Sequence, residues 1–338
     1  MSDLFKARQE AYSLATQKYN PGNNNHREYD SIYLAATSNV KDTLSLYNNY
    51  ESVLALGATG AHGFEAALHG AKRVDMFDIN ELQRIFFEFF KTAIMVLDYE
   101  EFVHYFSLEK QTFMFKKKDI ANLLGNDLFE RLVYYLPEDV SFVLEPIFEM
   151  FYSPDIIMSA LFRFEYNVSI GYLKKYISLY NKEDYNRLKE ILLTGECQFS
   201  YHQLSIEDVP KFFKDKYDLI ILDNLFQYYS KLRTLDTPYK INMFIRKELS
   251  NLLTDTGVIQ AAYGFEIASD SLKSMLNIPY TPYRSIFTPM VTKEEIKNGI
   301  VPNLIKKWPD NYSYDFIPGV EREEGRDTDN VVLTYRRK

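Results

Sequence analysis

Cysteine is almost absent from this chain of 338 residues, and Cys197 is the only one. A single cysteine cannot form an intrachain disulfide, and it cannot build a thiolate metal cluster by itself. The five histidines show none of the spacings of helical zinc motifs, so the sequence predicts no metal site. The chemistry of the protein therefore has to be sought in other side chains.

Long apolar runs and an excess of basic residues are also missing. No uninterrupted apolar stretch reaches about 18 residues, and the N-terminal residues mix acids and bases where a signal peptide has an apolar core. These features predict a cytoplasmic protein. The net charge of −8 argues against nucleic acid as the main partner, because phosphate backbones are bound by clustered Lys and Arg.

What the chain does have is a high content of hydrophobic residues, 46% of the total, which is ample for a core. Its length exceeds the usual size of one domain, so we expect two domains or one sheet that carries a large insertion.

The stretch VLALGATGAHGFEAALHGAKRVDMFDIN, residues 53–80, contains the first structural signal. An apolar run stops at Gly57 and predicts a buried parallel strand. The glycine turn GATGAHG leads into a helix that Gly70 ends, and a short strand then ends in Asp78. Strand, glycine turn, helix and strand together make half of a nucleotide-binding sheet.

Around this unit the sequence predicts an α/β fold in three parts. A helix over 3–18 opens the chain, and helical periodicity covers about 81–193. Strand patterns return later in the chain, at 196–204, 216–224, 256–265, 312–320 and 330–337. We predict a helical N-terminal arm (1–50), a Rossmann-like domain (51–83 and 197–338) and a helical insertion (84–196). The insertion is expected to form a lid or cap, because it leaves the sheet near the carboxyl ends of the strands.

The glycine turn and the acid after the second strand predict an adenosine-containing ligand. Glycines let backbone amides approach a ligand closely, and a helix N-terminus adds partial positive charge. Asp78 follows Gly57 by 21 positions (78 − 57), close to the ~20 expected for an acid that binds ribose hydroxyls. The alternative is that the glycines only tighten the turn and that Asp78 caps the next helix.

A nicotinamide dinucleotide is a second possible ligand. Short-chain dehydrogenases share this glycine spacing and a Tyr-x-x-x-Lys pair, which occurs here as Tyr185 and Lys189. In a chain with 27 tyrosines such a pair arises easily by chance. Both residues lie on one turn of a charged helix, which favours a solvated helix face.

Three later segments give a more specific indication of the ligand. LSIEDVPKFF (204–213) is similar to the segment that reads the adenine in class I S-adenosylmethionine-dependent methyltransferases, and LDNLF (222–226) resembles the motif of that fold that faces the sulfonium and the substrate. NLLTDTGVIQAAY (251–263) resembles its fifth strand with the preceding helix and turn. The resemblance implies a Rossmann-like sheet of about seven strands with an antiparallel last strand.

A narrower resemblance rests on GAKRVDMFDINELQ (70–83), LDYEEFVHYF (97–106) and IYLAATSN (32–39). These segments resemble the BtaA-like family, whose best-known members are 3-amino-3-carboxypropyl transferases of betaine-lipid synthesis, and the chain looks closest to uncharacterised bacterial relatives. The resemblance implies which residues contact the cofactor: Gly57, Thr59 and Gly60 at the methionine end, Asp78 at the ribose, Ser205, Ile206 and Glu207 at the adenine, and Asp223 with Asn224 at the reacting centre. Ala58 and Ile79 are expected as further cofactor contacts.

The function expected from these features is transfer of a methyl or 3-amino-3-carboxypropyl group from S-adenosylmethionine to a small-molecule or lipid-like acceptor. Asp223 and Asn224 are the catalytic candidates, although Asp223 is equally explained as an acid that caps a turn. His62 either touches the ligand or lies exposed at the helix start. A non-catalytic S-adenosylmethionine-binding module and an NAD(P)-dependent reductase remain the alternatives.

Overall fold

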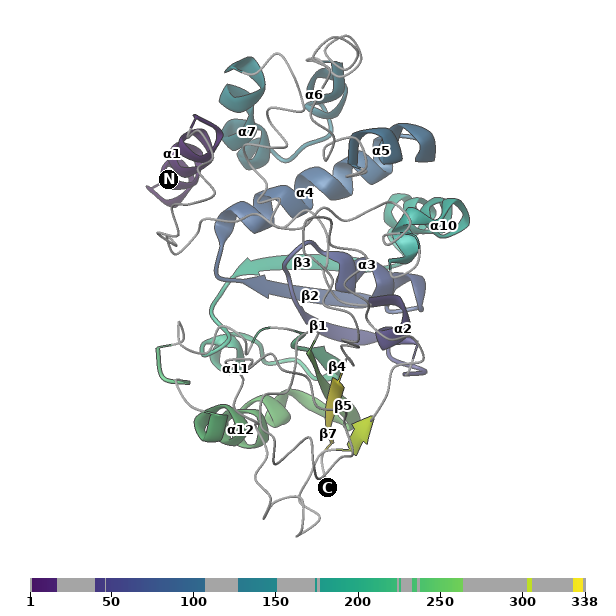
Figure 1. The fold of residues 1–338 in the computed structure, drawn as a ribbon, viewed down its shortest axis with the longest axis vertical. Helices are drawn as coiled ribbons and strands as arrows, with labels where there is room; N and C mark the ends of the chain where they lie inside the picture. The colour runs from purple at the N-terminus through teal and green to yellow at the C-terminus, as the bar shows by residue number, and fades with distance from the viewer. Residues whose placement is uncertain are drawn as a thin grey trace, which may run out of the picture.

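A computed structural model describes residues 2–16, 40–45, 47–106, 127–150, 174, 177–223, 225, 233–235, 238–263, 303–305 and 331–336. Within these ranges, strands form one sheet in the order β3-β2-β1-β4-β5-β7-β6 (Figure 1). The strands are β1 (Ser52–Leu56), β2 (Arg73–Asp78), β3 (Gln198–Gln203), β4 (Tyr217–Ile221), β5 (Leu253–Tyr263), β6 (Asn303–Ile305) and β7 (Val331–Arg336).

The sheet is mainly parallel, which confirms the predicted α/β class. β1 pairs in parallel with β2 and β4, β2 with β3, and β4 with β5. β7 runs antiparallel to both β5 and β6. Val53, Leu54 and Ala55 of β1 are fully buried, as expected for a central strand covered on both faces. The carboxyl ends of β1, β2 and β4 therefore meet at one edge of the sheet.

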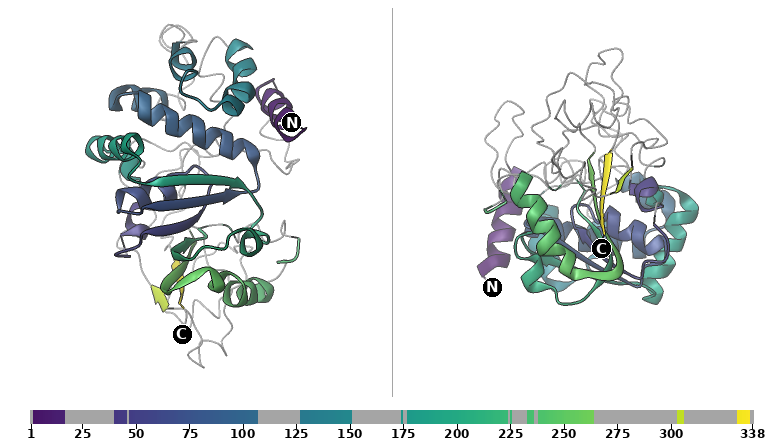
Figure 2. Two further views of the ribbon diagram at one scale, coloured as in Figure 1. Left: turned by 180° about the vertical axis from the view of Figure 1, so that it is seen from behind. Right: turned by 90° about the horizontal axis from the view of Figure 1, so that it is seen from below.

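Helices cover both faces of this sheet. The helices α3 (Ala61–Leu68), α4 (Glu81–Val96) and α10 (Lys182–Thr194) lie on one side, and α12 (Pro238–Lys247) lies on the other (Figure 2). Phe64 of α3 and Phe87 of α4 both pack against Phe199 of β3, with ring centroids 5.8 and 6.2 Å away. The short helix α11 (Val209–Phe212) contacts the opposite face, where Phe213 meets Tyr217.

The predicted helical segment leaves the sheet through α4 and returns through the 3₁₀ turn η2 (Ser178–Tyr180) and α10. Beyond α4 lie further helices (Figure 1), namely α5 (Tyr99–Phe106), α6 (Asp127–Leu132), α7 (Glu138–Met150) and the N-terminal α1 (Ser2–Thr16). The buried carboxylate of Glu65 in α3 accepts hydrogen bonds from the backbone amide and hydroxyl of Ser178, at 3.1 and 2.8 Å. This contact fixes the returning segment to α3, whereas its role as a lid stays a prediction.

Some sequence predictions fall outside the described ranges, and one strand was not anticipated. The strand expected over 312–320 and the IYLAATSN segment lie among residues that the structure does not describe. The three-residue strand β6 had no recognisable pattern. The helix α2 (Val40–Leu44) precedes the sheet. In the described part of the chain, no helix combines the length and apolar character needed to cross a membrane.

Candidate functional site

The glycine turn joins β1 to α3 at the carboxyl edge of the sheet. The amide of Gly57 donates to Phe77 O at 2.7 Å, and the amide of Gly60 donates to Gly57 O at 2.6 Å. Gly60 has φ 77° and Ala58 has φ 35°. A non-glycine residue in this region carries backbone strain, and such strain is often found at ligand-binding sites.

Packing alone already requires glycine at two positions of the turn. A Cβ atom on Gly57 would lie 2.2 Å from the hydroxyl oxygen of Tyr201, and one on Gly60 would lie 2.4 Å from Cδ2 of Phe87. The rings of Tyr201 and Phe87 also contact each other, with centroids 5.3 Å apart. The glycines therefore leave room for the side chains of Tyr201 and Phe87, and they do not by themselves indicate a ligand.

Asp78 ties the end of β2 to the glycine turn. Its Oδ2 accepts the amide of Ala58 at 3.2 Å, and its Oδ1 accepts the amide of Asn80 at 2.9 Å. Burial raises the pKa of Asp78 to about 6, although the amides of Asn80, Ala58 and Ile79 act to lower it. Two carboxylate oxygens offer about four acceptor positions, so Asp78 can still accept bonds from ribose hydroxyls.

The groups next to Asp78 have the chemistry that suits a nucleoside linked to an amino acid. Ile79, which directly follows Asp78, is 46% exposed. The hydroxyl of Thr59 accepts the amide of Ala61 at 3.2 Å. The next two amides, of His62 and Gly63, have no acceptor among the described residues. An apolar side chain, an acid and free amides at a helix N-terminus suit an adenosine and a carboxylate.

The acid expected at the reacting centre pairs with the histidine of the glycine turn. His62 Nε2 lies 2.9 Å from Asp223 Oδ2. Gln260 of β5 donates through Nε2 to the two oxygens of Asp223, at 3.0 and 3.3 Å. His62, Asp223 and Gln260 are 5%, 2% and 0% exposed, so His62 does not lie exposed at the helix start. The residues come from α3, the end of β4 and β5, and the sequence did not predict that they meet.

The segment predicted to read the adenine follows β3. Ser205 is half-buried, and the side chain of Ile206 is buried, so only its backbone is placed to contact a ligand. The carboxylate of Glu207 accepts bonds from the backbone and side chain of Thr234, and from Arg233 N and Nε at 3.2 and 3.1 Å. The adenine contact of Glu207 thus stays a prediction, while its carboxylate holds residues 233–234 in place.

Glu207→Gln is expected to lower the free energy of unfolding at pH 7 by about 2 kcal/mol, since hydrogen bonds to a charged acceptor are lost. Burial alone would raise the pKa of Glu207, but the donors from Thr234 and Arg233 lower it to about 2. The stabilisation is therefore complete above the unfolded pKa of about 4.3 and is lost as the pH falls toward 2. Urea unfolding of both proteins at pH 7 and pH 3 measures this, and an equal difference at both pH values would contradict it.

The Tyr185–Lys189 pair has a structural role. The hydroxyl of Tyr185, a fully buried residue, donates to Ile94 O and Leu97 O at 3.2 and 3.0 Å, and Lys189 Nζ donates to Leu97 O at 2.7 Å. The expectation of a solvated helix face is therefore wrong for Tyr185. The pair binds the carboxyl end of α4, whereas Asp78 precedes its amino end. The 16 residues of α4 span about 24 Å, so the Tyr185–Lys189 pair and Asp78 lie at opposite ends of this helix.

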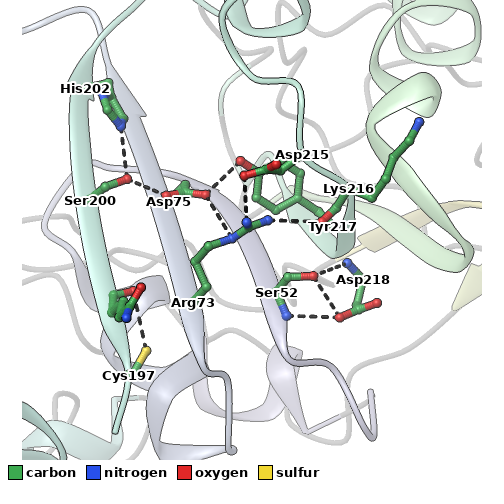
Figure 3. Close-up of polar contacts among 11 residues, drawn as sticks. Ser52, Arg73, Asp75, Cys197, Ser200, His202, Asp215, Lys216, Tyr217 and Asp218 are labelled. Atoms are coloured by element: carbon green, nitrogen blue, oxygen red, sulfur yellow. Dashed lines mark hydrogen bonds and ion pairs between the residues drawn. The ribbon is translucent and has the colours of Figure 1, made fainter. Parts of the chain in front are cut away.

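A second polar cluster lies on the face of the sheet opposite α3 (Figure 3). Asp75 accepts bonds from the hydroxyls of Ser200 and Tyr217 and pairs with Arg73, and His202 Nε2 lies 3.0 Å from Ser200 Oγ. Burial lowers the pKa of His202. In a nucleophilic triad the histidine lies between the acid and the serine. Here Ser200 lies between Asp75 and His202, so the cluster is not such a triad.

Of the predicted site residues, Asn224 alone falls outside the described ranges. Across the ranges that the structure describes, no three His, Cys, Asp or Glu side chains come together as a metal-ligand set.

No protein-family model matches the chain, and no curated protein matches it. Solved structures of the rRNA methyltransferase aviRa from Streptomyces viridochromogenes are similar to it. The structure at 2.4 Å resolution has 8% sequence identity over 96% of this chain and 89% of that chain, with a TM-score of 0.35. The structure at 1.5 Å has 9% identity over 84% and 76%, with a TM-score of 0.32.

Proposed function

We propose that the protein is an S-adenosylmethionine-dependent transferase of the class I type, with its cofactor along the carboxyl edge of β1, β2 and β4. The observation that carries the proposal is the contact between Ala58 and Asp78, which places an acid with spare acceptor capacity against the glycine turn. The order of the strands and the antiparallel β7 support it, because the methyltransferase resemblance implies such a sheet.

The residues present fit this cofactor. Asp78 would accept the ribose hydroxyls, Ile79 and the backbone of Ile206 would contact the adenine, and the amides of His62 and Gly63 would bind the methionine carboxylate. When bound, S-adenosylmethionine supplies a carbon made electrophilic by the neighbouring sulfonium. The protein's share is to bind and orient both reactants, which accounts for much of the rate in such reactions. The transferred group is a methyl or 3-amino-3-carboxypropyl group.

The acceptor that we propose is a small or lipid-like molecule. The aviRa structures belong to an rRNA methyltransferase, but a net charge of −8 makes this chain a poor match to an RNA backbone. A non-catalytic binding module is the second candidate, and it shares the same cofactor contacts. A reductase of the short-chain type lacks support, because Tyr185 bonds the far end of α4.

Calorimetric titration with S-adenosylmethionine, S-adenosylhomocysteine and NADPH tests the proposal. We expect the first two to bind at micromolar concentration and NADPH not to bind. Binding of NADPH alone would overturn the cofactor assignment. In a subsequent acceptor screen, release of methylthioadenosine indicates aminocarboxypropyl transfer, and release of S-adenosylhomocysteine indicates methyl transfer. Binding without either by-product would favour the binding module.

The affinity for S-adenosylmethionine is expected to depend on pH through Asp78. Ribose hydroxyls donate to an ionised carboxylate, and burial raises the pKa of free Asp78 to about 6. The dissociation constant should therefore be constant above pH 7 and rise by up to about tenfold per pH unit well below 6. Asp78→Asn is the control, because its weaker binding should lack this slope. A pH-independent affinity of the wild-type protein between pH 5 and 8 would contradict the assignment.

A further inference from the structure

The side chains of His62, Asp223 and Gln260 meet next to β1, where the strand order of the sheet reverses. β1 leads through α3 to β2 on one side, whereas β4, on the other side of β1, leads through α12 to β5. Open α/β sheets bind their ligands at such a switch point. His62 is the second residue of α3, Asp223 follows β4 by two positions, and Gln260 lies in β5.

The hydrogen bonds fix the tautomer of His62. An ionised carboxylate only accepts hydrogen bonds, so the 2.9 Å contact requires that Nε2 of His62 carry the proton. Gln260 supports this arrangement, because its amide NH₂ donates to both oxygens of Asp223. In a neutral imidazole the other nitrogen, Nδ1, then holds the lone pair. No described residue forms a hydrogen bond with Nδ1.

The free-energy cost of burying these polar groups indicates that the network has a role other than filling the core. All three residues are at most 5% exposed, and Gln260 Oε1 is buried without a hydrogen-bond partner among the described residues. Each buried polar atom without a partner costs about 1–3 kcal/mol, and apolar residues of similar volume avoid that cost. A buried acid–histidine–amide network at a switch point is thus explained better by chemistry than by stability.

We propose that His62 is the proton acceptor of this site, with Asp223 and Gln260 as positioning residues, and that the acceptor substrate is an O–H or N–H nucleophile. The inference rests on the proposed function. S-adenosylmethionine would supply the carbon whose bond to sulfur breaks, with the electron pair left on sulfur, as the bond to the nucleophilic oxygen or nitrogen forms. The proton of that nucleophile passes to Nδ1 of His62. The resulting imidazolium is stabilised by the carboxylate of Asp223.

The tautomer can be observed directly by long-range ¹H–¹⁵N NMR of the ¹⁵N-labelled full chain, with the His62 signals assigned by their loss in His62→Gln. We expect the neutral His62 to be protonated at Nε2, and its signals to shift on saturation with S-adenosylmethionine. In Asp223→Asn the side-chain NH₂ can donate to Nε2, so we expect conversion to the Nδ1–H form. The matched control is Asp218→Asn, the same substitution at the other end of β4, which should leave the tautomer of His62 unchanged.

Calorimetric titration of the same wild-type sample with S-adenosylmethionine distinguishes a failure of the proton-acceptor role of His62 from a failure of the proposed function. If S-adenosylmethionine binds but His62 is protonated at Nδ1, or its signals do not move, the proton-acceptor role is wrong and the proposed function stands. If S-adenosylmethionine does not bind, the proposed function fails, and the inference fails with it. Binding together with the Nε2–H form and shifted His62 signals supports both.

Discussion

Asp78→Asn is expected to weaken S-adenosylmethionine binding about 10- to 100-fold. Hydrogen bonds to a charged acceptor are worth about 1.5–3 kcal/mol, and a neutral amide offers ribose hydroxyls a weaker acceptor and a competing donor. Asp78 is held for this role by the amides of Ala58 and Asn80. Calorimetry at pH 8 measures the change, and an unchanged dissociation constant would contradict the ribose assignment.

The matched control for Asp78→Asn is Asp218→Asn, at the amino ends of the parallel strands. Asp218 accepts bonds from Ser52 N, Ser52 Oγ and Thr254 Oγ1, at 3.0, 2.9 and 3.0 Å (Figure 3 shows the contact with Ser52). Although burial opposes it, these donors hold the pKa of Asp218 below its usual value. Asp218→Asn should therefore lower the free energy of unfolding by about 1–3 kcal/mol. It should leave the affinity for S-adenosylmethionine unchanged.

The second large effect is expected from Gly57→Ala, which should destabilise the protein by about 3 kcal/mol. The new methyl group would lie 2.2 Å from the hydroxyl oxygen and 2.3 Å from Cζ of Tyr201. Overpacking of this kind costs about 1–3 kcal/mol, and more where the ring cannot move. Tyr201 is confined by Phe87, so little relaxation is expected. Chemical denaturation measures the loss, and a loss below about 1 kcal/mol would contradict the close contact.

Two further variants separate the clash from other effects of the new side chain. Gly195→Ala adds a methyl group without a clash, because nothing lies within 4 Å of its added Cβ. Since Gly195, unlike Gly57, has a positive φ of 72°, only backbone strain is expected there. In Gly57→Ala/Tyr201→Leu the smaller side chain leaves room for the methyl group. The double variant should be less destabilised than the sum of its single variants, by about 1–3 kcal/mol. If the losses of unfolding free energy in the two single variants simply add in the double variant, the cost of Gly57→Ala does not come from the contact with Tyr201.

The double variant also separates packing from ligand binding at the turn. The Cβ direction of Gly57 points at Tyr201. We therefore expect Gly57→Ala/Tyr201→Leu to bind S-adenosylmethionine about as well as Tyr201→Leu. A much weaker affinity of the double variant would mean that the ligand, and not only the aromatic ring, requires glycine at this position.

The elements that the sequence predicted well are those with strong local signals. β1 and β4 are short apolar runs, and α3 begins directly after a glycine turn, so local pattern and burial agree there. The acid at position 78 was identified by its spacing from Gly57, and the structure places it against the turn. By contrast, β6 has three residues and is defined only by its pairing with β7.

Contacts between distant residues were not predictable from one sequence. His62 and Asp223 are separated by 161 positions, and only the fold brings them together. Tyr185 was expected on a solvated face because its helix is rich in charge, but backbone carbonyls at the carboxyl end of α4, which lack partners within that helix, accept hydrogen bonds from its hydroxyl. Glu207 shows the same limit, since its partners follow it by 26 and 27 positions.

Hydrogen–deuterium exchange with and without saturating S-adenosylmethionine tests the central claim most directly, because it reports both binding and its place. We predict slower exchange in peptides that cover 56–63, 77–80 and 204–207. Peptides from α10 should be unchanged, since Tyr185 and Lys189 bond the far end of α4. Unchanged exchange at the glycine turn, or protection confined to α10, would contradict the proposed S-adenosylmethionine site.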